Sequence, residues 1–258
     1  MSEDPYARSD YRRLIAWESR IKREGPYLAE LLERAPDRSA LDVGCGTGEH
    51  VAFFAGLDAR AVGLDRSEKM IEQARDHESG GAARFFLGDA RKAREALADE
   101  PPFGLCICLG NMLPHVLEDD ELSALFREGR ELLAPGGLFL AQILNYRRIL
   151  GQGVRHLPLN FRSGEDCEEI VFLRLLKPAE NGRILFFPTT LSLDPESEDE
   201  PVSIKATRRV ELRAWTAEDL VPMLVASGFR VDLRGDMRGG EYDARRSSDL
   251  VFVAKRLR

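Results

Sequence analysis

The sequence predicts an α/β fold in which helices cover both faces of a doubly wound, mostly parallel sheet. Apolar runs typical of buried strands alternate with amphipathic helical runs five times between residues 39 and 144. Three glycines, Gly44, Gly46 and Gly48, directly follow the first of these apolar runs. In doubly wound sheets, the turn after the first strand is where a ligand comes close to the backbone. The pattern therefore predicts a ligand-binding sheet.

The segment before the alternating part has apolar residues at helical spacing between residues 11 and 35. This spacing is interrupted at Gly25 and Pro26, and both residue types disfavour the interior of a helix. We therefore expect two helices here, which cap the sheet.

The alternating part is expected to form parallel strands joined by helices. Ser67 is a suitable N-cap, and the run Ala134-Pro135-Gly136-Gly137 is a suitable helix stop. In chain order we expect strand 39–43, helix 49–56, strand 61–65, helix 67–77, strand 83–89, helix 92–99, strand 103–109, helix 119–133 and strand 138–144.

The pattern changes between residues 151 and 214, where three strand-like runs predict an antiparallel insert. The runs span residues 167–176, 182–193 and 202–214, and the acidic stretch 194–201 is expected to be a solvated turn. In the third run, one parity is occupied by Val202, Ile204, Ala206, Val210 and Leu212. A helix at 217–228 and strands at 229–235 and 249–256 then complete a sheet of seven strands.

These elements fit one domain of 258 residues, because 43% hydrophobic content is ample for a large core. The expected organisation is a helical lid at residues 1–38, an α/β core at 39–150 and 215–258, and an antiparallel insert at 151–214 on the acceptor side of the core. The sequence does not predict the oligomeric state.

The charge balance indicates which classes of partner are not expected. It carries 37 basic and 44 acidic residues, a net charge of −7, and has no basic run with interleaved aromatics. We therefore expect neither nucleic acid nor membrane as a partner. The first ten residues are polar and do not resemble a signal peptide, and the four cysteines lack metal-ligand spacing, so we expect a cytoplasmic protein without a metal site.

The glycine loop distinguishes between classes of nucleotide ligand. It reads G-x-G-x-G, with Glu49 where the third glycine of a dinucleotide fingerprint would stand, and no phosphate-binding lysine follows. A pyrophosphate ligand is therefore disfavoured. Asp65, at the end of the second strand, is placed to accept both hydroxyls of a ribose. This combination favours an adenosyl ligand without phosphates, and S-adenosylmethionine fits.

At these residues the chain resembles the class I S-adenosylmethionine-dependent methyltransferases, which have a Rossmann-like fold. The resemblance rests on LDVGCGTG, VGLDRSEKMIEQAR, FFLGDA and LLAPGGLF, which occur in order. It implies that Asp42 and the loop 44–48 flank the methionine part of the cofactor, Asp65 holds the ribose and Met70 lies on an adenine face. Asp89 and the Ala90 amide would meet the adenine edge. The full set expected to contact the cofactor is Arg20, Asp42, Gly44, Cys45, Gly46, Gly48, Asp65, Arg66, Met70, Gly88, Asp89, Ala90 and Leu109.

A narrower likeness lies in CICLGNMLPHV, which is similar to the corresponding stretch of glycine and sarcosine N-methyltransferases. It implies catalytic roles for Asn111 and His115, and Tyr146, in the asparagine-tyrosine pair after the fifth strand, is a third catalytic candidate. An asparagine oxygen can aim an amine by accepting its N–H, and a histidine can accept the proton of an ammonium group. The alternatives are that Asn111 is a turn residue and that His115 only packs against the cofactor.

The same likeness places Arg20 at the arginine that binds the cofactor carboxylate, on a lid helix. Alternatively, Arg20 is one of several solvated cations near the N-terminus. Met70 could instead be a core residue of its helix. Asp65 could instead be an acidic residue at the entry of a helix.

One position departs from the glycine-type enzymes. They carry an arginine for the substrate carboxylate immediately before an asparagine-tyrosine pair, whereas this chain has Leu144 before Asn145 and Tyr146. Glycine is therefore disfavoured as an acceptor unless another arginine binds its carboxylate. The candidates for lining the acceptor pocket, whose alternative is to be solvated or packed at the surface, are Arg147, Arg148, Arg155, Arg162, His156 and Tyr242.

The sequence thus predicts a methyltransferase that uses S-adenosylmethionine and acts on a small molecule, with a nitrogen acceptor preferred. The alternatives are an O-methyltransferase, an aminosugar N-methyltransferase and a non-catalytic cofactor-binding module. A covalent cysteine mechanism is disfavoured, because Cys106 and Cys108 lie inside an apolar strand. The tetrad typical of nucleic-acid base N-methylation is absent after the fourth strand, where residues 110–113 read GNML.

Overall fold

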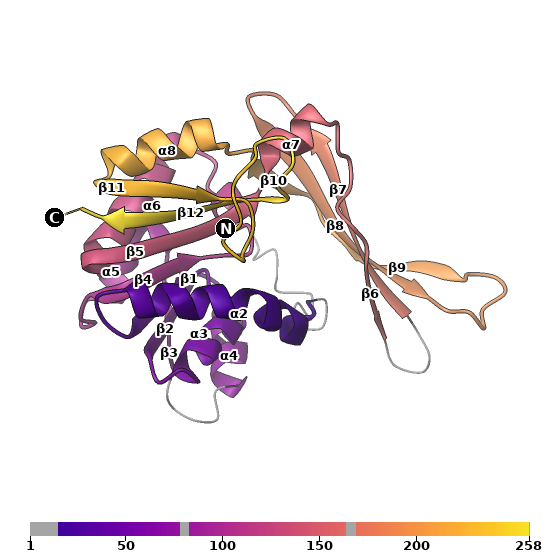
Figure 1. Cartoon of the computed structure of the whole chain (residues 1–258). Coiled ribbons are helices and arrows are strands. Elements are labelled where there is room, and N and C mark those ends of the chain that lie inside the picture. The colour runs from indigo at the N-terminus through magenta and orange to yellow at the C-terminus, as the bar shows by residue number, and fades with distance from the viewer. Residues whose placement is uncertain (1–14, 78–82, 164–168, 258) are drawn as a thin grey trace.

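The computed structural model describes residues 15–77, 83–163 and 169–257, and it contains two sheets (Figure 1). The larger sheet has seven strands in the order β11-β12-β5-β4-β1-β2-β3. Their bounds are β1 (Ser39–Val43), β2 (Arg60–Asp65), β3 (Ala83–Leu87), β4 (Phe103–Cys108), β5 (Leu133–Leu144), β11 (Phe229–Arg234) and β12 (Asp249–Arg256). Strands β1 to β5 pair in parallel, whereas β12 is antiparallel to both β5 and β11. The predicted doubly wound, mostly parallel sheet is confirmed.

Helices cover both faces of this sheet, which produces two separate apolar layers (Figure 1). Strands β1 and β4 are buried along their whole length, as central strands covered on both faces should be. One face is covered by α2 (Trp17–Arg34), α3 (Glu49–Ala55) and α4 (Glu68–His77), and the other by α5 (Ala93–Ala96), α6 (Asp119–Leu132) and α8 (Ala217–Ala226). Short 3-10 turns, η1 (Ala90–Lys92) and η2 (Leu113–His115), follow β3 and β4.

The expectation of two N-terminal helices is wrong for the described part of that segment, because α2 runs through Pro26 as one helix. Pro26 lies on the exposed side, whereas Leu28, Leu31 and Leu32 are buried on the other side. Burial of this leucine face stabilises the helix by more than one interior proline costs. Gly25 permits close packing, since a Cβ there would lie 2.9 Å from the Phe53 ring.

The expected stop after α6 is also different. The helix ends at Leu132, and β5 already begins at Leu133 and continues through residues 134–137. Gly136 has a φ of 80°, and the register between β4 and β5 shifts between Phe103 and Leu105. The glycine-rich run is therefore an irregular beginning of a strand and not a turn before it.

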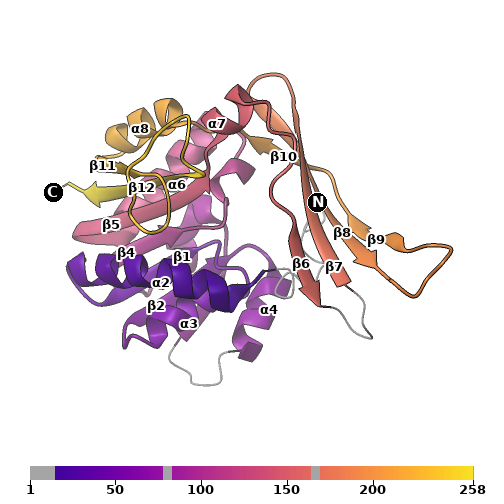
Figure 2. The same ribbon diagram turned by 45° about the vertical axis from the view of Figure 1, so that its right-hand side comes forward.

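The second sheet is antiparallel and projects from the α/β domain as an arm (Figures 1 and 2). We call strands β6 to β10 the arm. Their bounds are β6 (Asn160–Ser163), β7 (Glu169–Pro178), β8 (Arg183–Leu193), β9 (Val202–Thr207) and β10 (Val210–Arg213). The base of the arm is fixed to the α/β domain through Leu176, Ile184 and Leu212, which join the same apolar layer as α6 and α8.

The third strand expected in the insert is broken into β9 and β10, and its single parity does not persist. A bulge shifts the β8–β9 register between Thr190 and Leu191, so Ile204 pairs with Leu191. Leu212 pairs with Ile184, whose side chain is on the opposite face of β8. The alternating apolar residues therefore serve two faces of the sheet, which periodicity alone does not reveal.

Two further elements were not predicted, namely β6 and the short helix α7 (Tyr146–Gly151) after β5. Asn145 caps α7 by accepting a hydrogen bond from the Arg148 amide at 3.2 Å. Among the described helices, none combines the length and apolar character needed to cross a membrane.

The proline inside α2 gives a stability prediction. Replacing Pro26 with alanine restores an N–H inside the helix and removes the clash of the ring with the preceding turn. Because Pro26 is exposed, no buried contact is lost. We expect the free energy of unfolding, measured with urea, to rise by about 1 kcal/mol or more. The matched control Pro195→Ala, in an exposed turn, should bring no gain, and an unchanged urea midpoint for Pro26→Ala would contradict this explanation.

Candidate active site

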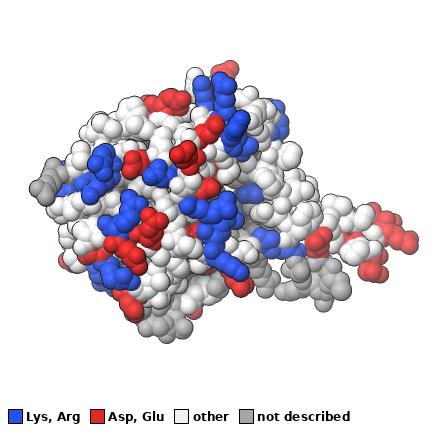
Figure 3. Space-filling view, viewed as in Figure 1, with Lys and Arg blue, Asp and Glu red and all other residues white. Residues whose placement is uncertain are grey.

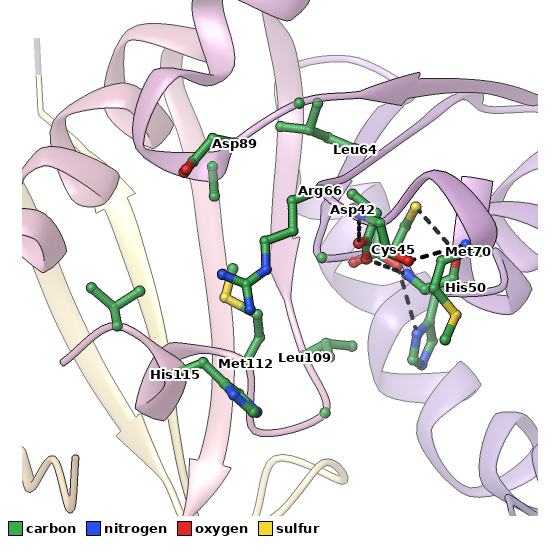
Figure 4. Close-up of a pocket in the computed structure, with 18 of the residues that line it drawn as sticks. Asp42, Cys45, His50, Leu64, Arg66, Met70, Asp89, Leu109, Met112 and His115 are labelled. Carbon is green, nitrogen blue, oxygen red and sulfur yellow. Dashed lines mark hydrogen bonds and ion pairs between the residues drawn. The ribbon is translucent and has the colours of Figure 1, made fainter. Parts of the chain in front are cut away.

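A cavity of about 180 Å³ lies at the carboxyl ends of β1, β2 and β4, where the loops after these strands meet (Figure 4). In a doubly wound sheet this edge is the place for a ligand. Gly48, Asn111 and Tyr146 are predicted site residues that do not line the cavity. The predicted residues that do line it are Arg20, Asp42, Gly44, Cys45, Gly46, Asp65, Arg66, Met70, Gly88, Asp89, Ala90, Leu109 and His115.

The glycine loop after β1 needs its glycines for two reasons. Gly44 has a φ of 79°, and a Cβ there would lie 2.9 Å from Met112 Cγ on the opposite wall. Gly46 has a φ of 54°, and a Cβ there would meet nothing within 4 Å. Both residues are in the left-handed region that favours glycine. The loop therefore presents bare backbone at the cavity.

Asp65 ties the ends of β1 and β2 together. Its Oδ2 accepts a hydrogen bond from the Gly46 amide at 2.9 Å, and its Oδ1 accepts one from the Ser67 amide at 2.9 Å. Ser67 in turn accepts a bond from the Met70 amide with its hydroxyl, as its predicted N-cap role requires. Since each carboxylate oxygen can accept more than one bond, Asp65 keeps the capacity to receive ribose hydroxyls.

Helix α2 reaches the cavity through a row of charged side chains. Arg20 donates from Nε to both carboxylate oxygens of Glu24 at 3.1 Å. Glu24 Oε2 lies 3.3 Å from His50 Nε2, and His50 Nδ1 lies 3.8 Å from Asp42 Oδ2. Glu24, His50 and Asp42 are all buried. Trp17 completes the group by packing edge-on against the His50 ring and under the Arg20 guanidinium.

The pKa values of the two carboxyl groups in this row, Glu24 and Asp42, are shifted in opposite directions. Burial raises the pKa of Glu24, but the His50 hydrogen bond and the Arg20 charge outweigh it and lower this pKa to about 2. Burial raises the pKa of Asp42 to about 6, against the opposing charges of His50 and Arg20. At neutral pH the ionised Asp42 is held at a cost of roughly 3 kcal/mol. Asp42 is therefore a buried anion that favours a cationic ligand.

The other end of the cavity is closed by ion pairs around Asp89. Arg91 binds Asp89 through Nε, at 2.9 and 3.1 Å, and also binds Glu121. The Arg91 hydrogen bonds lower the pKa of Asp89. Figure 4 shows Arg66 extending from the end of β2 across the cavity towards Met112 and His115. The cavity thus has the carboxylates of Asp89 and Glu121 at this end and the Arg66 guanidinium in its centre.

Asn111 and Tyr146 lie together behind the cavity wall. Asn111 Nδ2 donates to the Tyr146 hydroxyl at 2.9 Å, and Asn111 Oδ1 accepts from the Leu144 amide at 2.9 Å. Asn111 has a φ of 64°, and its turn follows directly after β4. Burial raises the pKa of Tyr146, so its hydroxyl stays protonated. The pair fixes the loop that leads to η2.

His115 lines the cavity and is partly buried (Figure 4). Burial, helped by the nearby Arg66 charge, lowers the pKa of His115 to about 4. The imidazole is therefore neutral at neutral pH. A neutral imidazole can accept a hydrogen bond, but a group with this pKa is a weak proton acceptor at pH 7.

Most of the arginines proposed for an acceptor clamp donate to backbone carbonyls. Arg148 donates to Ser247 at 3.0 Å, Arg155 to Leu176 at 2.9 Å and Arg162 to Phe161 at 2.5 Å. Arg147 and His156 are exposed. Tyr242 donates to Asn145 Oδ1 at 3.4 Å and packs against the core. Leu144 also packs against that core, so its position presents an apolar side chain.

Sequence reasoning missed several residues that shape the cavity. Trp17 and His50 belong to the row that joins α2 to Asp42, and Arg91 and Glu121 close the opposite end. His50 carried a usable signal, because it is a titratable residue in the first helical turn after the glycine loop. The others become neighbours only through tertiary packing.

Comparison with known proteins finds methyltransferases that are similar to this chain. Residues 40–137 match the family model described as a methyltransferase domain. A glycine/sarcosine N-methyltransferase from Parasynechococcus marenigrum is 30% identical over 160 residues, which cover 60% of this chain and 56% of that protein. A ubiquinone biosynthesis O-methyltransferase from Thiobacillus denitrificans is 37% identical over 116 residues, covering 43% and 47%.

Among solved structures, CalS10, an amino pentose methyltransferase from Micromonospora echinaspora with S-adenosylmethionine bound, is similar. The TM-score is 0.72 at 20% identity, over 95% of this chain and 94% of that chain, which is a likeness of fold. The chain spans about half the length of the curated relatives it matches. The resemblance to class I S-adenosylmethionine-dependent methyltransferases is confirmed by these matches.

Asp65 gives a first prediction for the site. Asp65→Ala is expected to weaken binding of S-adenosylhomocysteine by roughly 30-fold to 1000-fold, which corresponds to about 2 to 4 kcal/mol. The loss would combine the expected ribose contact with the support that the carboxylate gives to the Gly46 and Ser67 amides. Isothermal titration calorimetry measures it. As a control, Asp232→Ala on the distant strand β11 should bind like the wild type, and equal affinity for Asp65→Ala would exclude the ribose role.

Asp42 gives a prediction of pH dependence. Because the pKa of Asp42 is raised to about 6, the carboxyl group is ionised at pH 7 and mostly protonated at pH 5. A protonated Asp42 cannot offer its charge to the ammonium group of the ligand. We expect the affinity for S-adenosylhomocysteine to fall up to about tenfold between pH 7 and pH 5. In Asp42→Asn the affinity should be lower at pH 7 and lose most of this slope; a slope equal to that of the wild type would show that another group titrates.

Proposed function

We propose that this chain, which carries a class I S-adenosylmethionine-dependent methyltransferase domain, transfers a methyl group from S-adenosylmethionine to a nitrogen atom of a small molecule. The observation that carries the proposal is the cavity itself. It joins a bare glycine loop, the Asp65 carboxylate and the buried anion Asp42 at one side to His115 at the other.

The residues fit S-adenosylmethionine by their chemistry. Gly46 offers backbone where a Cβ would project into open space, Asp65 offers acceptors for hydroxyls, and Asp42 offers a charge for an ammonium group. Arg20, at the cavity and on the covering helix α2, is our candidate for the cofactor carboxylate. When bound, S-adenosylmethionine supplies an electrophilic methyl group, and this chain's residues position the acceptor and exclude water.

The properties of His115 favour nitrogen over oxygen as the acceptor atom. A hydroxyl acceptor must lose its proton to become a strong nucleophile, and this needs a base whose pKa is near neutrality. His115 has a pKa of about 4, which is too low for that task. An uncharged amine already has a lone pair, so positioning is sufficient. The imidazole of His115 can accept an N–H of such an amine and aim it.

In our proposal, Asn111 and Tyr146 position His115 for its contact with the acceptor amine. Their mutual hydrogen bond, and the bond between Asn111 and the Leu144 amide, hold the loop that presents Met112 and His115. The Asn111 oxygen already accepts from the protein, so its role in our proposal is to position His115 more than to touch the acceptor.

The base of the arm supports the segment that follows His115. Trp215, which follows β10, donates to the Val116 carbonyl at 3.0 Å, and Arg183 on β8 donates to the Leu117 carbonyl at 2.8 Å. Val116 lines the cavity next to His115. Figure 2 shows β6 and β7 extending beyond this anchor, across from α2 and α4. The anchored base of the arm therefore supports the edge of the cavity at Val116, beside His115, where we place the acceptor.

The apolar Leu144 favours an amine without a carboxylate. An amino sugar is a suitable class, because neighbouring hydroxyl groups lower the basicity of its amine and increase the uncharged fraction at neutral pH. One solved relative by fold is described as an amino pentose methyltransferase, which supports this choice. The O-methyltransferase match keeps a hydroxyl acceptor as the second candidate.

A panel assay with labelled methyl donor tests the proposal. Amino sugars, glycine, sarcosine and phenols are offered to the purified chain, and label transfer and S-adenosylhomocysteine are measured. We expect transfer to an amino sugar nitrogen and little to glycine. Transfer to phenols alone would overturn the choice of nitrogen. Tight S-adenosylhomocysteine binding with no transfer to any acceptor of a broadened panel would favour a non-catalytic cofactor-binding module.

Leu144 provides a prediction of selectivity. Leu144→Arg places a guanidinium group where the glycine-type enzymes hold a carboxylate, and such a pair contributes roughly 1.5 to 3 kcal/mol. We expect kcat/KM for glycine or sarcosine to rise by about tenfold or more above a low wild-type value. Leu144→Met, which keeps an apolar side chain, is the matched control and should show no rise. Efficient methylation of glycine by the wild type would contradict the argument from Leu144.

A further inference from the structure

Helix α2 carries three polar or aromatic side chains on one face. Trp17, Arg20 and Glu24 are spaced three and four residues apart, which places them one above the other on a helix. Trp17 and Arg20 line the cavity, and Glu24 is buried. The side chain of Arg20 is only 15% exposed and that of Glu24 only 6%. Few conformations are open to an arginine this enclosed, so the groups around it decide where its hydrogen bonds point.

Two contacts hold the Arg20 guanidinium from different directions. Glu24 accepts from Arg20 Nε with both carboxylate oxygens at 3.1 Å, along one edge of the group. The Trp17 ring lies under its plane, with the guanidinium carbon 5.0 Å from the ring centroid. Neither of the two terminal nitrogens, Nη1 and Nη2, donates a hydrogen bond to another described residue. Arg20 therefore keeps the edge formed by these two nitrogens for a ligand.

The loop after β4 leaves room beside that edge. Arg20 Nη1 and Nη2 both lie 3.9 Å from the position that a Cβ of Gly110 would take. Gly110 has a φ of 71° and lines the cavity. An edge with two parallel N–H donors matches the two oxygens of a carboxylate. The geometry therefore suits the carboxylate of S-adenosylmethionine.

Glu24 is itself held by the helix that follows the glycine loop. His50, in the first turn of α3, has Nε2 at 3.3 Å from Glu24 Oε2 and Nδ1 at 3.8 Å from Asp42 Oδ2. Arg23 donates to Glu24 Oε1 at 3.2 Å from an exposed position. Figure 4 shows His50 and Asp42 on the same side of the cavity. The imidazole thus connects the carboxylate that holds Arg20 to the carboxylate that we expect to meet the ammonium group of the cofactor.

Two simpler explanations of the pair between Arg20 and Glu24 fit less well. Pairs four residues apart stabilise a helix best when the acidic residue comes first, and here the arginine comes first. The negative charge of Glu24 by itself opposes the binding of a carboxylate nearby. On the face shown in Figure 3, which includes α2, basic and acidic side chains are interspersed over the α/β domain, so this surface does not draw an anion by a charge of one sign. The direction that Glu24 gives to Arg20 remains as its contribution.

We propose that Glu24 and His50 are positioning residues: Glu24 holds the Nε edge of Arg20, and His50 holds Glu24, so that Arg20 Nη1 and Nη2 point at the carboxylate of the cofactor. The inference rests on the proposed function, in which Arg20 binds that carboxylate. Because the same imidazole borders Asp42, one connected group of side chains then binds both the ammonium and the carboxylate of the cofactor.

Calorimetry with two ligands tests the role of Glu24. S-adenosylhomocysteine carries the carboxylate, and its carboxamide analogue has nearly the same shape without the charge. We expect the wild type to bind S-adenosylhomocysteine at least about tenfold more tightly than the carboxamide. Glu24→Met should lose most of this preference by weakening S-adenosylhomocysteine alone. Glu24→Gln keeps an acceptor for Arg20 Nε and should retain most of the preference.

The helix offers a matched control and the two ligands separate positioning from loss of structure. Glu30→Met removes an exposed pair with Arg34 that has the same spacing, and it should bind both ligands like the wild type. A lid that no longer folds would weaken both ligands equally. Equal weakening of both ligands in Glu24→Met would therefore overturn the proposal, as would an unchanged preference. A gain in affinity for S-adenosylhomocysteine would also overturn it, because loss of the negative charge alone predicts a gain.

Two variants of His50 test the second contact in the same assay. Glutamine places an amide nitrogen close to the position of Nε2, so His50→Gln should keep most of the preference for the carboxylate. His50→Leu cannot bond to Glu24 and should lose most of it. Equal preference in His50→Gln and His50→Leu would show that His50 does not position Glu24.

Arg20→Met separates this inference from the proposed function. This variant should abolish the preference for the carboxylate, and adding Glu24→Met to it should change the preference no further, because the two residues act through one contact. If Arg20→Met keeps the wild-type preference, the proposed role of Arg20 is wrong. If Arg20→Met loses the preference and Glu24→Met keeps it, only the positioning role of Glu24 is wrong.

Discussion

The hydrogen bonds that Asp65 accepts from the amides of Gly46 and Ser67 hold the whole site together. They join the loop after β1 to the loop after β2, at the edge where all parallel strands end. The left-handed backbone at Gly46 is costly for any other residue, and the carboxylate stabilises it by satisfying its amide. Asp42 and His50 flank the same loop in sequence, so the row of charges that reaches α2 depends on the loop's position. One side chain thereby serves both the architecture of the loop and the expected recognition of ribose.

The sequence was most informative where a signal is local. Strand β12 begins and ends at the predicted residues, and the buried strands β1 and β4 are recognisable because apolar runs in a parallel sheet are nearly continuous. Prediction failed where tertiary packing overrides a local signal. Helix α2 continues through Pro26 because its leucine face is buried, and β9 and β10 separate at a bulge and a break that leave the alternation of residues unchanged.

The site divides in the same way. The glycine loop, Asp65, Met70 and Asp89 follow from short motifs, and the structure brings them to one cavity. The pairs that complete the site link distant residues: Glu24 and His50 are 26 positions apart, and Asn111 and Tyr146 are 35 apart. The two residues of each pair become neighbours only when the chain folds, so no short motif contains both members of a pair.

The position of β12 has a consequence for how the chain folds. It follows every other strand in the sequence, yet it lies in the interior of the sheet between β5 and β11. Until residues 249–256 have left the ribosome, β5 is an unpaired edge and β11 has no neighbour in the sheet. An unpaired apolar edge attracts other strands, and β5 is buried at most of its positions in the finished sheet. The nascent protein therefore carries this unpaired edge of β5 while residues 145–248 are synthesised, and chaperone demand should be greatest just before β12 emerges.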